Sequence, residues 1–148
     1  MKLHSLGIAI LLVALSGCAT TTLEQRNFKS YSVGQLLSAS VGEVFLVDQS
    51  GTVTKCKYWV GFLNSPDGWK IIEQYSPEYF RKELVYSGIS GNVLEISYRE
   101  YRGGLAAPAF FQSVKYDLAE SKTVRFQKYQ IEVVNANNQG IQCRLLSD

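Results

Sequence analysis

Few residues in this chain could do nucleophilic or metal chemistry, and their positions restrict the possible reactions. The chain has three cysteines, Cys18, Cys56 and Cys143, and a single histidine, His4, near its start. From residue 5 onward, the lack of histidine excludes Ser-His-Asp and Cys-His nucleophile systems and histidine-bearing zinc sites. The sequence also lacks a glycine-rich phosphate loop and a calcium-binding acidic loop. We therefore expect no cofactor and no metal.

Carboxylates are the remaining candidates for catalysis. Two acidic side chains can hydrolyse a glycosidic bond when they face each other across the substrate. Nothing in the spacing of the acidic residues brings two of them together, so we expect that the chain is not an enzyme. A carboxylate-based hydrolase acting on envelope glycans stays open as an alternative, with these candidates: Glu73, Glu83, Glu95, Glu100 and Asp117.

The densest polar and aromatic segment is Tyr98-Arg99-Glu100-Tyr101-Arg102. On a strand, Arg99 and Tyr101 would share one face, and Tyr98, Glu100 and Arg102 would share the other. Tyrosine and arginine are enriched at binding hot spots, so this segment is a candidate binding face. The alternative is a solvated strand face with cross-strand charge pairs.

The N-terminus has the features of a secretion signal. Lys2 is followed by the uncharged, apolar or small run Leu6 to Leu15, and then by Ser16-Gly17-Cys18. Ten helical residues cover roughly 15 Å, about half of a bilayer core, so the run indicates a signal peptide and not a membrane-spanning helix. Leu15 to Cys18 resembles the bacterial lipobox. This resemblance implies that residues 1–17 are removed and that Cys18 carries lipid.

The lipobox resemblance also implies a location. Ala19, and not aspartate, follows the cysteine. In bacteria with two membranes this resembles the sorting pattern for the outer membrane. We therefore expect the chain to be held by its lipid in the cell envelope, at the periplasmic face of the outer membrane.

Cleavage before Cys18 would leave 131 residues, which is enough for one domain with a real core. Residues 18–27 are polar and without a period, which predicts a short tether ahead of a single domain over 28–148. Of the 15 basic residues only Lys2 would be removed, which leaves 14 basic against 13 acidic side chains. A nearly neutral domain has no electrostatic reason to bind nucleic acid.

Two cysteines would remain once Cys18 carries lipid. Outside the cytoplasm, two cysteines tend to pair, and Cys56 and Cys143 allow only one connectivity. Closing so long a loop would stabilise the domain by roughly 4 to 5 kcal/mol in the chain-entropy model. We predict this disulfide; two unpaired core cysteines are the alternative.

Alternating polar and apolar residues, turn signals every 8 to 12 residues and 18 aromatic side chains indicate strands throughout. No segment has a long helical period. The predicted fold is all-β, an antiparallel sandwich or small barrel of about seven to nine short strands. The strands are expected at these ranges: 44–47, 52–62, 69–75, 83–86, 92–101, 110–117, 123–126, 129–134 and 141–145.

The second half of the chain contains Glu83-Leu84-Val85-Tyr86 and, further on, Tyr98-Arg99-Glu100. These two stretches resemble segments of uncharacterised proteobacterial lipoproteins. The resemblance implies no activity. Small envelope lysozyme inhibitors are also lipidated β proteins with a disulfide, so an inhibitor-like module is a further alternative. The expectation that follows is a membrane-anchored, non-catalytic β domain that binds an envelope protein or supports an envelope assembly.

Overall fold

A computed structural model describes residues 20–103, 105–106 and 111–148. The predicted signal peptide and Cys18 lie outside the described residues. Within them the chain forms three antiparallel sheets and no helix, which confirms the all-β class. There are thirteen described strands and not seven to nine, because short pairings and an N-terminal strand add to the predicted set. The sheets are open, and two of them form a sandwich.

The larger sheet of the sandwich has six strands. Its order is β10-β8-β7-β4-β2, with β9 paired to the end of β8. β7 and β8 form the long central hairpin, in which a bulge beside Gly88 shifts the register by one residue. The strand bounds are β2 Phe28–Lys29, β4 Val44–Ser50, β7 Phe80–Ser90, β8 Val93–Arg102, β9 Leu105–Ala106 and β10 Gln112–Asp117.

The second sheet of the sandwich has four strands in the order β11-β12-β13-β3. The hairpin of β12 and β13 brings the end of the chain beside β3, which comes from the first half of the sequence. Side chains alternate between buried and exposed along β11 and β13, as the period of two predicts. The bounds are β3 Leu36–Ser40, β11 Thr123–Phe126, β12 Tyr129–Ala136 and β13 Gly140–Ser147.

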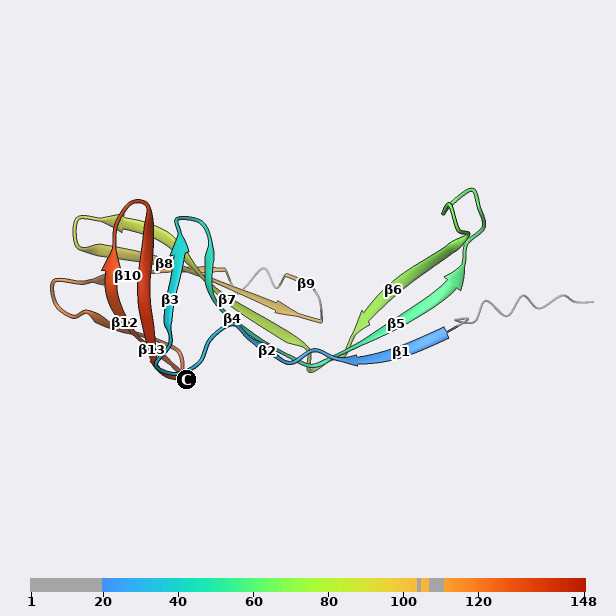
Figure 1. The fold of residues 1–148 in the computed structure, drawn as a ribbon, viewed down its shortest axis with the longest axis horizontal. Coiled ribbons are helices and arrows are strands. Elements are labelled where there is room, and N and C mark those ends of the chain that lie inside the picture. The colour runs from blue at the N-terminus through green and yellow to red at the C-terminus, as the bar shows by residue number, and fades with distance from the viewer. Residues whose placement is uncertain (1–19, 104, 107–110) are drawn as a thin grey trace, which may run out of the picture.

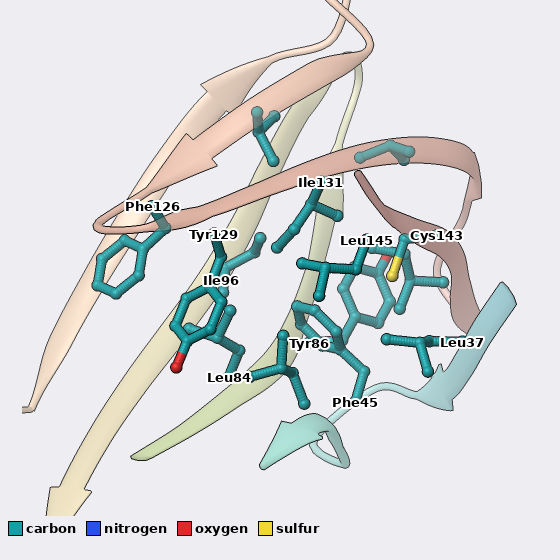
Figure 2. Close-up of a cluster of buried hydrophobic side chains, with 14 of the residues drawn as sticks. Leu37, Phe45, Leu84, Tyr86, Ile96, Phe126, Tyr129, Ile131, Cys143 and Leu145 are labelled. Atoms are coloured by element: carbon teal, nitrogen blue, oxygen red, sulfur yellow. The ribbon is translucent and has the colours of Figure 1, made fainter. Parts of the chain in front are cut away.

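The hydrophobic core lies between these two sheets, and Figure 2 shows part of it. Its largest fully buried side chains are Tyr86, Tyr98 and Tyr129. Each tyrosine hydroxyl has a hydrogen-bond partner: Tyr86 donates to the carbonyl of Asn137 at 2.6 Å, and Tyr129 donates to Asp48 at 2.9 Å. Among the described residues no buried polar side-chain atom lacks a partner, so the tyrosines can fill the core without an unpaired hydroxyl.

The third sheet projects from the sandwich as an arm (Figure 1). It has the order β1-β5-β6, with bounds β1 Thr20–Gln25, β5 Thr52–Trp59 and β6 Trp69–Tyr75, and residues 60–68 form the loop at its far end. None of its residues belongs to the sandwich core. We refer to these three strands and this loop as the arm.

The N-terminal part of the predicted tether is a strand. Residues 20–25 form β1, which pairs along β5 from Thr20 opposite Lys57 to Gln25 opposite Thr52. The prediction of an unstructured tether over 18–27 is therefore wrong for these residues. Three consecutive threonines favour a strand once a partner edge is available, and the partner edge lies thirty residues further along the chain.

The chain passes between sandwich and arm at a narrow neck. Gly51 separates β4 from β5, and its φ of +123° is one that side-chain-bearing residues rarely adopt. A Cβ on Gly51 would lie 2.5 Å from the Cα of Tyr79, on the segment that returns from the arm. The backbone N–H of Arg26 donates to the Gly51 carbonyl at 2.9 Å, and that of Ser76 donates to the Thr52 carbonyl at 3.0 Å. These bonds fix the direction in which the arm leaves the sandwich.

Candidate interaction surface

The arm carries large apolar side chains on surface that is open to solvent. Leu63 is completely exposed, Phe62 is 72% exposed and Ile71 is 59% exposed. Val53 and Cys56 are the buried hydrophobic residues of its described strands. A single three-stranded sheet has no second layer to cover its apolar side chains, and exposed apolar patches mark interaction sites. The exposed set is Leu23, Trp59, Phe62, Leu63, Ile71 and Ile72.

β6 is an open edge of the arm. Within the part of the chain that the structure describes, it pairs with β5 on one side and with no strand on the other. All seven residues of β6 are exposed or half-buried, and Ile71 and Ile72 point to opposite faces. Proteins usually protect such edges with charge, proline or a bulge, and here the charged residues are Lys70 and Glu73. An open edge of this length can accept a strand from another protein.

A strip of charged residues joins the three strands of the arm on one face. Arg26 lies 3.2 Å from Glu24 and 2.8 Å from Glu73, and Lys55 lies 2.8 Å from Glu24. Hydrogen bonds from Lys55 and Arg26 lower the pKa of Glu24, and hydrogen bonds from Arg26 and Tyr75 lower the pKa of Glu73. Both groups are therefore carboxylates at neutral pH. The strip aligns the strands, and its exposure keeps its contribution to stability small.

The predicted binding face on β8 is divided between the core and the surface. Tyr98 and Glu100 are buried, while Arg99 and Tyr101 are half-buried on the other face and Arg102 is exposed. Tyr98 donates a short hydrogen bond to Glu100, and Arg102 lies 2.7 Å from the same carboxylate. The alternation is as predicted, but these five residues do not form one binding face, because the Glu100 carboxylate is satisfied inside the sandwich.

Burial raises the pKa of Glu100, but the hydrogen bonds from Tyr98 and Arg102 more than offset this effect, so its pKa is lowered overall. Burial and the bond to Glu100 raise the pKa of Tyr98. The Tyr98 ring also packs on Phe126 with the ring centres 5.0 Å apart. These residues therefore connect the two sheets of the sandwich.

Asp48 on β4 is another buried carboxylate, and no motif in the sequence singles it out. It accepts a hydrogen bond from Tyr129 and lies 2.9 Å from the ammonium of Lys128. Burial alone would raise the pKa of Asp48, but the hydrogen bonds from Lys128 and Tyr129 outweigh burial, so its pKa is lowered overall. Asp48, Lys29, Phe80 and Lys128 line an open groove of about 490 Å³ at the neck end of the sandwich. The charges in this groove are paired, so it is a structural cluster and a poor anion site.

The five carboxylates that the sequence offered for hydrolysis do not come together as an acid and a base. Glu73 lies on the arm, whereas Glu83 and Glu95 lie on the sandwich, paired with Arg81 and Lys115. Asp117 accepts a hydrogen bond from the backbone of Ala119 in a turn. Glu24 and Glu73 share Arg26, and hydrogen bonds from their neighbours lower the pKa of both, whereas glycoside hydrolysis needs one carboxyl group with a raised pKa.

The predicted disulfide between Cys56 and Cys143 is wrong. Cys143 lies on β13 with a free thiol, surrounded by the apolar side chains that Figure 2 shows. Cys56 lies on β5 in the arm, which is a different sheet. Burial raises the pKa of Cys143 to about 12, so its thiol stays protonated and unreactive in the folded protein. Sequence spacing could not show that the two cysteines belong to separate parts of the fold.

The described residues contain no helix that is long and apolar enough to cross a membrane. They also contain no group of three or more His, Cys, Asp or Glu side chains that could hold a metal ion. In comparisons with known proteins, no family model, no curated protein and no solved structure matches this chain.

Proposed function

We propose that this chain is a lipid-anchored protein of the bacterial envelope that binds a protein partner through the open edge of β6. The observation that carries the partner is the edge itself, which has seven exposed or half-buried residues and isoleucines on both faces. The lipid anchor rests on Leu15-Ser16-Gly17-Cys18 after an apolar run. The location we propose is the periplasmic face of the outer membrane.

Strand addition suits this edge better than a side-chain pocket does. Backbone groups along the outer side of β6 can bond to an incoming strand, and Ile71 and Ile72 offer an apolar contact on either face. The neck fixes the direction of the arm, so the edge is presented without a large ordering cost. No arrangement of the described side chains favours the hydrolase or the lysozyme-inhibitor-like alternative.

The anchor is tested by a single substitution. Cys18→Ala should block cleavage before residue 18 and abolish incorporation of labelled fatty acid. Undiminished labelling of that variant would contradict the lipid attachment at Cys18.

The partner is tested by a pair of variants. The double variant Ile71→Lys, Ile72→Lys places charge on both faces of the edge. We expect this variant to lose strand addition. The control is Val33→Lys with Val134→Lys, which changes two exposed residues of the sandwich. A partner that copurifies from crosslinked cells with the wild type and the control, and is lost from the β6 variant, supports the proposal. Retention in all three contradicts it.

A further inference from the structure

The end of the arm is an aromatic and aliphatic cluster, which we call the arm tip: Trp59, Phe62, Leu63 and Trp69. The Trp59 ring meets Phe62 at 5.0 Å and Trp69 at 5.3 Å between ring centres, both edge to face. Despite these contacts Trp59 is half exposed, and Phe62 and Leu63 have little cover. Apolar side chains thus project from the end of the arm furthest from the sandwich.

The loop that presents the tip is held by its own hydrogen bonds. The backbone N–H of Val60 donates to the carbonyl of Gly68, and the N–H of Gly68 donates to Ser65, both at 2.9 Å. The Asn64 side chain donates to the Val60 carbonyl at 2.9 Å, and Asp67 accepts from Ser65 at 2.6 Å. Internal pairing of this kind lowers the cost of moving a loop out of water.

Gly68 lets Trp59 lie flat on the loop. Its φ is +74°, and a Cβ at this position would come within 2.2 Å of the Trp59 ring. The ring therefore packs against the loop backbone, whereas the Leu63 side chain is completely exposed. The tip is a preformed apolar projection.

The pairing of β1 puts the start of the mature chain at this same end of the arm. Thr20 is opposite Lys57, two residues from Trp59. Cys18 is two residues before Thr20 in the sequence, and two residues of chain reach at most about 7 Å. A lipid on Cys18 would therefore enter the bilayer beside the tip.

We infer that the arm tip lies in the polar–apolar interface of the membrane, next to the lipid anchor. This inference rests on the proposed lipid attachment at Cys18. Tryptophan is favoured at this depth, because its ring is apolar and its N–H can meet headgroups. Lys57 and Lys70 flank the tip; the Lys57 ammonium lies over the Trp69 ring at 5.2 Å, and such side chains extend to phosphate groups.

The inference also orients the molecule. β5 runs for eight residues from the neck to Trp59 of the tip, which corresponds to roughly 26 Å of strand. The sandwich would then stand away from the membrane, and the middle of the β6 edge would stay accessible between the two. The arm tip and the β6 edge thus have separate occupants.

Intrinsic fluorescence tests the inference without an added probe, because Trp59 and Trp69 are the two tryptophans of the whole chain. The full-length lipidated protein is placed in vesicles of phosphatidylethanolamine and phosphatidylglycerol with brominated acyl chains. Bromine near the glycerol should quench the emission strongly, and bromine near the chain end weakly. Leu63→Asp should remove most of this quenching. The control Val33→Asp, on an exposed part of the sandwich, should retain it.

The possible outcomes distinguish failure of the membrane contact at the arm tip from failure of the proposed lipid attachment at Cys18. Absence of quenching overturns the inference, whether or not mass spectrometry finds lipid on Cys18. Quenching that persists in Leu63→Asp overturns it as well. If the protein carries lipid but the tip is not quenched, the proposed anchor stands and the tip lies outside the bilayer. If the chain carries no lipid and the tip is quenched, the tip contact stands and the proposed anchor fails.

Discussion

The sandwich and the arm are built from similar strands but bury their side chains very differently. In the sandwich, two sheets face each other, and the core draws residues from nearly every strand of both. The arm has one sheet, and β6 exposes five of its seven residues. Alternating apolar residues stabilise a strand only where a second layer covers one face. The sandwich therefore supplies its own second layer, whereas no second layer covers the arm among the residues that the structure describes.

The largest expected effect comes from comparing one isoleucine substitution in the sandwich with one in the arm. Ile96→Ala in the sandwich core should lower the free energy of unfolding by about 2–5 kcal/mol, because Ile96 is 1% exposed and its loss leaves a cavity. Ile71→Ala on the arm should change it by less than about 0.5 kcal/mol. Urea unfolding of both variants measures the difference. Equal losses would mean that the arm has a core of its own.

The neck should be the next most sensitive point. Gly51→Ala should cost about 1–3 kcal/mol from backbone strain, and the contact with Tyr79 adds to it. Gly88→Ala is the matched control, because Gly88 has the same φ of +123° with open space around it. Limited proteolysis of the arm, together with urea unfolding, should show a larger loss for Gly51→Ala. Identical losses of unfolding free energy in the two variants would show that the contact with Tyr79 adds nothing to the cost of Gly51→Ala.

Alkaline pH should destabilise the sandwich through its buried tyrosines. Burial raises the pKa of Tyr31 to about 12 and also raises that of Tyr129. Their contribution is complete below about pH 10, where the unfolded chain keeps the phenol proton. It falls as the pH rises toward 12, by up to about 1.4 kcal/mol per pH unit for each group. Urea midpoints between pH 8 and 11 should show this decline, and Tyr31→Phe should reduce its slope.

The free thiol gives the smallest effect. Cys143→Ala should cost about 1 kcal/mol, the loss of one buried sulfur, in contrast to the roughly 4 to 5 kcal/mol of a lost long-loop disulfide. In the wild type, Cys143 should resist alkylation while folded and react after unfolding without reductant. Peptide mapping locates the label. Labelling of Cys143 only after reduction would contradict the free thiol.

Strands could be predicted from the sequence because their signals are local. The predicted ranges 69–75 and 123–126 coincide with β6 and β11, since turn residues bound both runs. The fold class followed from the same alternation. The departure of β5 and β6 from the sandwich could not be predicted, because their alternation resembles that of the core strands and only a long-range pairing decides which layer covers them.

The candidate site was missed for a related reason. The prediction favoured Tyr98 to Arg102 because Tyr and Arg are common in interfaces, yet Glu100 and Tyr98 satisfy each other inside the sandwich. The useful signal was the two tryptophans at either side of a loop that holds Phe62 and Leu63. Such residues are ordinary in a core, and only their exposure makes them a candidate site.

The central claim is that the arm is covered in the cell and that the sandwich is not. Site-specific photo-crosslinking in living cells tests it, with the reactive residue placed at Ile71 or Gln74 on the β6 edge and at Lys115 or Arg125 on the sandwich. The arm positions should give one discrete adduct, and the sandwich positions should give none. An adduct at twice the mass of the chain would identify the partner as a second copy. Discrete adducts from the sandwich, with none from the arm, would contradict the account.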